Sequence, residues 1–317
     1  MIWRYLFTMF VILIQKYRPK FHILIDYMKS ILFLFPFLLQ ASFLVAQNMT
    51  DASLFLRSDS TRYLDYVSSK SGDLYSALGH HGPAIENEWL GLRLYFDKKA
   101  AIDVYSKANR GLELSQYRWY PTPEQQMQGK GADYYKVGST VGLGGIRLWD
   151  GEKVVPLHPV SNRLARVAKE GSVSFMEMLS EDVPYRNGKV DILVRVTVYS
   201  GVRKAKVEAF ALSDAQVEFV TGINYHPGQQ VVVEEDRIFT WGLHPEDVAD
   251  EKVELGAAIF LNPDDCALKM DDGNQHIFIL KPAKYLSYWI SSANGKEPVI
   301  NTLDRFIDFA TLEMNTN

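Results

Sequence analysis

The sequence predicts an all-β protein that folds as a large antiparallel β-sandwich with few short helices. Apolar residues recur with a period close to two along most of the chain after residue 88, which is the pattern of half-buried strands. Turn-forming pairs such as Asn187-Gly188 and Asp150-Gly151 separate these segments. Many short strands, few helical patterns and no internal repeat are together typical of an antiparallel sandwich.

The clearest strands are three alternating segments. Within residues 89–96, Leu90, Leu92 and Leu94 fall on one face. Small or branched apolar residues alternate with polar ones over residues 190–198 and again over 205–211. Because Ser200-Gly201 lies between the last two segments, they predict an antiparallel hairpin with one face on a core.

The remaining strands are predicted by the same reasoning over residues 153–157, 172–179, 217–223, 230–235, 238–241, 255–261 and 276–280. A short helix or a lead-in strand is expected over residues 54–64, and the one other helical pattern covers 245–252. No internal linker stands out, so residues 47–317 are expected to form a single domain. All-β domains commonly reach this size as single units.

Residues 28–46 have the order of a secretory signal peptide. Met28 and Lys29 form a positive start, an almost wholly apolar run follows over residues 31–45, and the small Ala46 precedes the expected cleavage site. The run is shorter than the roughly 20 apolar residues of a membrane span. A lipid anchor would need a cysteine at the cleavage site, and the sole cysteine is Cys266. We therefore expect a periplasmic protein with no stable membrane association after signal cleavage.

Residues 1–27 allow two interpretations. Residues 2–14 are apolar but interrupted by Arg4, and could form a membrane anchor. The interpretation we favour is that translation starts at Met28 and that residues 1–27 are a mis-assigned extension. Neither interpretation affects the fold expected for residues 47–317.

Composition and charge narrow the class of protein. A hydrophobic fraction of 47% and an aromatic fraction of 13% are ample for a packed core. The net charge of −4, with signs interspersed, speaks against a nucleic-acid partner. A single cysteine excludes a disulfide framework and a thiolate metal cluster. The sequence makes no prediction of oligomeric state.

Residues 79–89 are the first of three segments that differ from ordinary strands and turns. They place His80 and His81 beside Glu86 and Glu88, which suits proton transfer, metal binding or simply a solvated loop. A metal needs three or four ligands, and neighbouring side chains of an extended chain point to opposite faces. At most one histidine would therefore face a given site, and we predict no metal and no cofactor.

The second and third segments carry further polar groups. Residues 133–136 are Asp133, Tyr134, Tyr135 and Lys136, bracketed by glycines that let a backbone approach a ligand closely. A phosphate-binding loop is excluded because no Gly-Lys-Ser/Thr follows a strand. The plain alternative is a long ordered loop that packed tyrosines stabilise. In the third segment, His226 and His244 each precede a proline, and a core or turn role is favoured for both.

At these segments the chain resembles a known family. The shared features are Glu86-Asn87 ahead of a strand that ends at Tyr95, then residues 102–107, 133–138, 142–145 and 148–151. On these motifs the chain resembles the domain of unknown function numbered four-eight-six-one, found in Gram-negative bacteria that degrade polysaccharides. The resemblance runs more weakly from about residue 74 to residue 288. Many members carry an Arg-rich, acidic stretch where this chain has residues 80–83, which indicates a subgroup.

The resemblance implies a carbohydrate-processing enzyme on a galactose-mutarotase-like supersandwich. Such proteins are encoded beside uronic-acid hydrolases and lyases, and some relatives are implicated as dehydratases of ulvan oligosaccharides. The implied substrate is an oligosaccharide that ends in a uronate, and the implied reaction is loss of water by β-elimination. A base must take the C5 proton, an acid must protonate the departing 4-hydroxyl, and a cation must stabilise the carboxylate.

Site residues are predicted on that chemistry. The proton-transfer groups are His81 (or His80) and Tyr135, whereas Lys107 and Lys136 bind or neutralise the carboxylate. Asp133 and Glu88 orient these groups. The other predicted substrate-binding residues are Asn87, Tyr134 and His226.

Three other functions stay open. A glycoside hydrolase would use paired carboxylates among Glu86, Glu88, Asp103 and Asp133, at a separation that sets its mechanism. A non-catalytic glycan-binding sandwich would present an exposed aromatic platform. A mutarotase-like epimerising enzyme would share the predicted architecture.

Overall fold

The structure is a computed structural model that describes residues 49–118, 120–245, 249 and 251–315. The predicted signal peptide at 28–46 and the stretch 1–27 lie outside the described residues, as does much of the predicted helical segment 245–252. Within the described part of the chain, no helix has the length and apolar character needed to cross a membrane.

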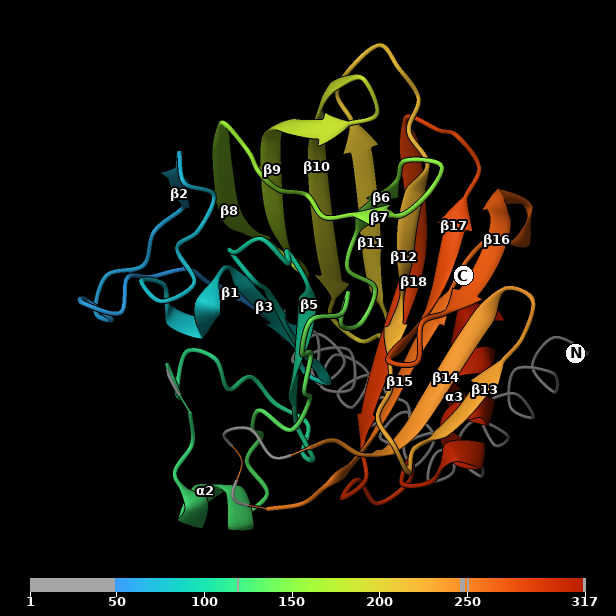
Figure 1. Cartoon of the computed structure of the whole chain (residues 1–317). Coiled ribbons are helices and arrows are strands. Elements are labelled where there is room, and N and C mark those ends of the chain that lie inside the picture. The colour runs from blue at the N-terminus through green and yellow to red at the C-terminus, as the bar shows by residue number, and fades with distance from the viewer. Residues whose placement is uncertain (1–48, 119, 246–248, 250, 316–317) are drawn as a thin grey trace, which may run out of the picture. The chain divides into compact units, whose positions relative to one another are not determined.

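Three antiparallel sheets make up the domain (Figure 1). The nine-stranded sheet has the order β13 (Gln230–Val233), β14 (Arg237–Leu243), β15 (Glu254–Phe260), β18 (Tyr285–Asn294), β11 (Ala205–Ala211), β10 (Gly188–Tyr199), β9 (Val173–Tyr185), β8 (Asn162–Glu170) and β2 (Tyr66–Ser69). The four-stranded sheet is β1 (Thr50–Ser53), β3 (Ala84–Asn87), β4 (Leu90–Leu94) and β5 (Ile102–Ser106). The five-stranded sheet is β16 (Cys266–Asp271), β17 (Gln275–Leu280), β12 (Phe219–Asn224), β6 (Arg147–Trp149) and β7 (Val154–Val155).

The predicted all-β antiparallel sandwich is confirmed. The predicted hairpin is β10 and β11, which pair with Val194 opposite Ala209. Strand β8 was not predicted, because the core-facing Arg163 interrupts its apolar pattern. Arg163 is buried and donates hydrogen bonds to the carbonyls of Gly72 and Asp97, which compensates its burial.

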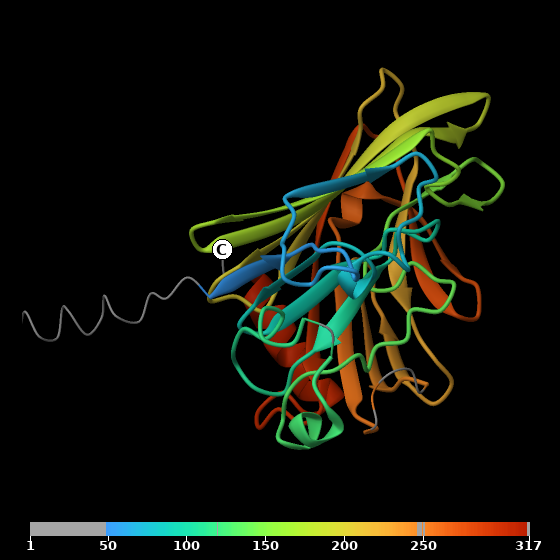
Figure 2. The ribbon, with the colours of Figure 1, turned by 90° about the vertical axis from the view of Figure 1, so that its left-hand side faces the viewer.

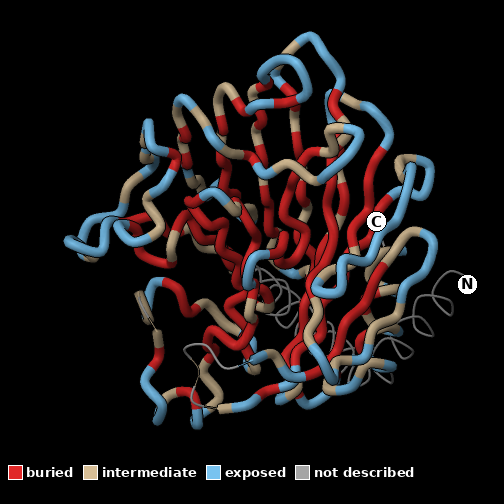
Figure 3. The backbone as a smooth tube through the Cα atoms, in the orientation of Figure 1, coloured by how far each residue is buried: buried red, intermediate tan, exposed pale blue. Residues whose placement is uncertain are grey.

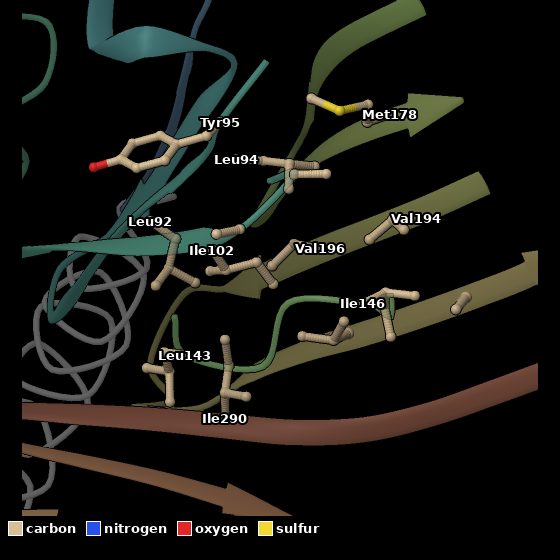
Figure 4. Packing of buried hydrophobic residues seen from close by; sticks show 14 of the residues in the cluster. Leu92, Leu94, Tyr95, Ile102, Leu143, Ile146, Met178, Val194, Val196 and Ile290 are labelled. Carbon is tan, nitrogen blue, oxygen red and sulfur yellow. The ribbon is translucent and has the colours of Figure 1, made fainter. Parts of the chain in front are cut away.

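The main core lies on one face of the nine-stranded sheet. Val194 and Val196 of β10 pack there against Leu92 and Leu94 of β4 (Figure 4). In the side view, the blue-to-green segments of the first half of the chain lie along this face (Figure 2). Burial is concentrated in the strands, while the turns between them are exposed (Figure 3). The inner face of the four-stranded sheet therefore packs on the nine-stranded sheet, and the side chains of its outer face point away from this core.

Helices are few, as predicted, but the longest one was missed. The described helices are α2 (Pro123–Met127), α3 (Leu303–Asn315) and the short 3₁₀ turns η1 (Gly79–His81) and η2 (Pro263–Asp265). Helix α3 begins after Thr302, whose hydroxyl accepts the Arg305 N–H at 3.4 Å. Phe306 and Ala310, four residues apart, bury one face of α3 in a second core cluster. Residues 54–64 form no helix.

Candidate active site

The outer face of the four-stranded sheet carries charged residues. Because strand side chains alternate, Leu92 and Leu94 point into the core and Arg93 points to the opposite face. Asp103 of β5 lies directly opposite Arg93 in the antiparallel register, so the two side chains meet on that face. The Tyr95 hydroxyl also points away from the core, as Figure 4 shows.

The chain between β5 and β6 covers this outer face. The Glu86 carboxylate, on β3, accepts the backbone N–H groups of Glu113 at 2.8 Å and Leu114 at 2.7 Å. Further along, Ala132 exchanges two backbone hydrogen bonds with Ser106, each 3.0 Å long. These bonds hold Asp133 and Tyr135 over the sheet. The second unusual segment, residues 133–136, therefore lies against Arg93.

Arg93 is the centre of a buried ionic cluster. Its guanidinium forms ion pairs with Asp103 and, at 2.5 Å, with Asp133. It also donates a hydrogen bond to the Tyr120 hydroxyl at 2.9 Å. Tyr95 donates to Asp103 at 2.7 Å, and Tyr120 donates to Asp133 at 3.1 Å. We call these five residues the Arg93 cluster.

Burial sets the protonation states of this cluster. Burial raises the pKa of the Asp103 carboxyl to about 7, against the opposing effect of the Arg93 guanidinium. Burial and the Asp103 carboxylate raise the pKa of Tyr95 far above its ordinary value. Burial likewise raises the pKa of Tyr120. Both phenols are therefore proton donors at neutral pH.

The two histidines of the first unusual segment lie in a strained turn beside this cluster. His80 has φ +54° and His81 has φ +61°, a left-handed conformation that non-glycine residues rarely adopt. Gly79 and Gly82 flank the histidines, and any side chain at either position would clash with its neighbours. A Cβ on Gly79 would lie 2.1 Å from the Phe55 ring, and one on Gly82 would lie 2.0 Å from the Leu94 carbonyl oxygen. Consecutive strained residues of this kind are found preferentially at functional sites.

The two histidine rings have different surroundings, as predicted, although the backbone there is a turn and not an extended chain. His81 stacks on Tyr75 with ring centroids 3.9 Å apart, and contacts Tyr95 edge-on at 5.8 Å. The His81 Nδ1 atom lies 3.1 Å from the Tyr75 carbonyl oxygen. A carbonyl can only accept, so Nδ1 carries the hydrogen and Nε2 is the acceptor of the neutral ring. Burial lowers the pKa of His81, which favours this neutral form.

His80 is instead a buried neutral ring. It is 2% exposed and packs edge-on against Phe55 at 5.4 Å. Burial, with smaller effects of Arg93 and His81, lowers the pKa of His80 to about 3. Of the two predicted alternatives, His80 is the less suited to proton transfer, because its ring is buried against Phe55 and its pKa of about 3 makes it a very weak base.

Protonation of His80 predicts an acid-sensitive fold. A histidine pKa depressed in the folded state contributes stability that is present above its unfolded pKa of 6.5 and lost as pH falls toward 3. Between about pH 7 and about pH 5, the wild type is expected to lose about 2 kcal/mol more unfolding free energy than His80→Gln. Urea unfolding of both proteins at the two pH values measures this difference. Parallel losses would contradict the neutral, buried state of His80.

The second and third unusual segments meet at the Lys136 peptide unit. Its N–H donates to His244 Nδ1 at 3.2 Å, and its carbonyl oxygen lies 2.8 Å from His226 Nε2. His244 Nε2 therefore carries the ring hydrogen, and burial lowers the pKa of His244 to about 3. The Tyr135 ring lies 4.4 Å from the His244 ring. The two histidines hold the backbone that positions Tyr135, which fits the turn role favoured for them from the sequence.

Tyr135 is fully buried, and its hydroxyl makes no hydrogen bond to any described residue. Burial, with a smaller effect of the Asp103 carboxylate, raises the pKa of Tyr135 well above its ordinary value. Among the described side chains, Asp103 Oδ1, His80 Nε2 and His244 Nε2 are also buried without a hydrogen-bond partner. Buried polar atoms are normally paired with protein or water. Asp103 belongs to the Arg93 cluster and Tyr135 contacts His244, so these unpaired atoms are candidates for binding water or a ligand.

Three predicted site residues lie away from this cluster. The Lys107 ammonium donates to Glu86 at 2.8 Å and to the carbonyl oxygens of Asn87 and Gly111, so its three hydrogens are occupied. The Asn87 side chain accepts from two backbone N–H groups of the β3–β4 turn and donates to two carbonyl oxygens at the β10–β11 turn. Glu88 accepts from the Gly201 N–H at 2.9 Å. These contacts hold strands and turns together, and they do not support the catalytic role predicted for Lys107.

Sequence reasoning missed Arg93, Tyr95 and Tyr120 as members of the site, and considered Asp103 only for a hydrolase. A signal was present for Arg93, since it is the one charged residue between the leucines of an otherwise apolar strand. In the described residues, no group of three or more His, Cys, Asp and Glu is arranged to hold a metal ion.

The fold and the site define an all-β protein with a buried acid–base cluster on the outer face of its smallest sheet. The chain belongs to the family described as a domain of unknown function (DUF4861), whose profile matches residues 36–314. The predicted family is thereby confirmed. Among proteins of curated function, none matches the chain.

Several solved structures are similar in part. A protein from Klebsiella pneumoniae, provisionally assigned as an aldose 1-epimerase, shares 9% identity at a TM-score of 0.41, over 83% of this chain and 96% of that one. A 4-alpha-glucanotransferase from Thermococcus litoralis shares 11% identity at 0.32, over 67% of this chain and 37% of that one. A heparan sulfate lyase (HepC mutant) from Pedobacter heparinus shares 11% at 0.33, over 67% and 33%. These values are too low to inform the chemistry of this chain.

Proposed function

We propose that this protein is a carbohydrate-processing enzyme that removes water from the non-reducing-end uronate of an oligosaccharide. The observation that carries the proposal is that two groups lie beside one buried ionic cluster. They are His81, a neutral histidine, and Tyr135, a protonated phenol without a hydrogen-bond partner among the described residues. His81 has the protonation state of a base, and Tyr135 has that of an acid. The substrate class is the one implied by the family resemblance.

The proton movements follow from these states. His81 Nε2 takes the C5 proton of the uronate, and the electron pair of that C–H bond forms the C4–C5 double bond. The C4–O bond breaks, and the Tyr135 hydroxyl gives its proton to the departing oxygen, which leaves as water. Transfer of a proton from the histidinium to the phenolate, directly or through water, restores both groups.

The other members of the cluster position these two groups. Tyr95 contacts the His81 ring and donates to Asp103, so the ionic cluster fixes the side of the site on which His81 lies. The Lys136 peptide unit and His244 fix Tyr135 on the other side. Lys136 stays the proposed partner of the substrate carboxylate.

The protonation states predict the pH dependence of the reaction. The pKa of His81 is lowered below 6.5, so its basic form already predominates at pH 6.5. The acid limb of kcat/KM is therefore expected to have its midpoint below pH 6.5. Initial rates across the pH range measure it. A midpoint well above 7 would show that another group is the base.

The proposal is tested by incubating the purified protein with uronate-ended oligosaccharides from ulvan, pectin and alginate. Elimination gives the ultraviolet absorbance of an unsaturated uronate and a product lighter by one water. Neither signal with any of the three would end the proposal. New reducing ends without absorbance would favour a glycoside hydrolase that uses Asp103 and Asp133, the two carboxylates bound to Arg93.

We also propose that the mature protein is periplasmic, with residues 28–46 removed as a signal peptide. N-terminal sequencing of the protein from periplasmic extract tests both points. A mature chain that begins upstream of Met28 would contradict them.

A further inference from the structure

A wide groove lies next to the candidate active site. It has a volume of about 640 Å³, and polar side chains of Lys98, Lys99, Ser139, Thr140, Arg147 and Gln275 line it. Val154 and Pro156 give it an apolar part. This mixture of an apolar wall and a few polar groups is common in sites for small ligands.

The groove is cationic. Lys98 and Lys99 line it together with Arg147, and none of the acidic residues that the structure describes does so. Two carboxylates lie beside the groove. Asp97 lies 3.8 Å from the Lys99 ammonium and accepts the Lys99 backbone N–H at 2.8 Å, and Asp272 accepts from the Gln275 side chain at 2.6 Å. Two carboxylates beside three cations leave the groove with a net positive charge.

Arg147 is the unusual member of this group. It is 6% exposed and donates only to backbone carbonyls, those of Lys99, Ile146 and Thr140. Among the described residues it forms no ion pair within 4 Å, whereas the buried Arg93 and Arg203 each have carboxylate partners. Burial lowers the pKa of Arg147 to about 10, so it remains charged at neutral pH. The Asp97 carboxylate acts on Arg147 only from beyond ion-pair distance. A buried guanidinium with no carboxylate in direct contact favours an anionic ligand.

Lys99 connects the groove to the active site. Its ammonium lies 5.1 Å from the Tyr95 ring and 5.6 Å from the Tyr75 ring, the two tyrosines that contact His81. It also donates to the carbonyl oxygen of Gly138 at 3.2 Å, two residues beyond Lys136. A saccharide whose reacting unit lies at His81 can therefore place a neighbouring unit in the groove.

We propose that this groove binds an anionic group, a carboxylate or a sulfate ester, on the sugar next to the one that reacts. The choice of an oligosaccharide as the ligand rests on the proposed function, but the charge of the groove does not. The enzyme would on this account select acidic chains over neutral ones, through cations that take no part in the chemistry.

The test is a binding measurement by calorimetry, so that it does not depend on turnover. The probes are a uronate-containing disaccharide, the same disaccharide carrying a sulfate ester, and a neutral disaccharide. The wild type is expected to bind the acidic probes more tightly than the neutral one. Lys98→Glu is expected to weaken acidic binding roughly five- to tenfold and leave neutral binding unchanged. A stronger effect on the sulfated probe would identify sulfate as the group bound.

Lys284→Glu is the matched control, because Lys284 is exposed and does not line the groove. Lys99→Gln provides a second variant of the groove with a smaller change of charge. The proposal is overturned if the acidic probes bind no better than the neutral one, or if Lys98→Glu and Lys284→Glu weaken them equally. If binding depends on charge but no elimination is observed, the groove proposal stands and the proposed function is contradicted. The failure of one proposal can therefore be distinguished from the failure of the other.

Discussion

Replacing Arg93 with methionine is expected to lower the unfolding free energy by about 3–5 kcal/mol. The substitution keeps much of the side-chain volume but removes the only counter-charge within ion-pair distance of Asp103 and Asp133 among the described residues. Both carboxylates are buried, so each would have to be protonated or hydrated in the folded protein. Urea unfolding at neutral pH measures the loss.

Arg166→Met is the matched control. Arg166 also pairs with a carboxylate, that of Glu177, but its side chain is 48% exposed. Its loss is expected to cost at most about 1 kcal/mol. Adding Asp103→Asn to Arg93→Met should recover part of the stability, because one buried charge is then removed. Equal, small losses in the two arginine variants would contradict the buried ionic cluster.

Tyr135→Phe is expected to lower kcat by roughly 10²–10⁴-fold, the usual contribution of a general acid. KM should change little, because the ring and its contact with His244 remain. The Tyr135 hydroxyl has no hydrogen-bond partner among the described residues, so its removal should not lower the unfolding free energy. Steady-state kinetics and urea unfolding of the same preparation separate the two effects.

Tyr288→Phe gives the opposite expectation. The Tyr288 hydroxyl donates to the Gly144 carbonyl oxygen at 2.5 Å and accepts from Thr221 at 2.8 Å. Its removal should destabilise the fold by about 1–3 kcal/mol and leave kcat nearly unchanged. If Tyr135→Phe instead behaved like Tyr288→Phe, the phenol of Tyr135 would be structural and the proposed acid would be wrong.

Period-two alternation predicted many of the strands that have one apolar and one polar face, although β5 and the central β18 were not among them. It therefore found β10 and β11, whose valines and alanines line the core. It missed β8, where Arg163 occupies a core-facing position and is compensated by carbonyls distant in sequence. It also missed α3, although Leu303, Phe306, Ala310 and Met314 carry the helical period along the element.

The candidate site was predictable in part for a related reason. Unusual local sequence identified His81 and Tyr135, and the structure places both beside the Arg93 cluster. Lys107 had the same chemical type as a catalytic lysine, but its three hydrogen bonds depend on tertiary neighbours that no sequence pattern shows. Arg93 was overlooked because its importance comes from Asp133, a residue on a distant loop.

Abstraction of the C5 proton by His81 is the central step, and an isotope label follows it directly. A uronate-ended oligosaccharide that carries deuterium at C5 is incubated with the wild type and with His81→Gln, and the products are analysed by mass spectrometry. The account predicts that the wild-type product has lost the 4-hydroxyl and the deuterium together, and that His81→Gln yields almost none of it. A product that retains deuterium at C5, or equal turnover by His81→Gln, would contradict it.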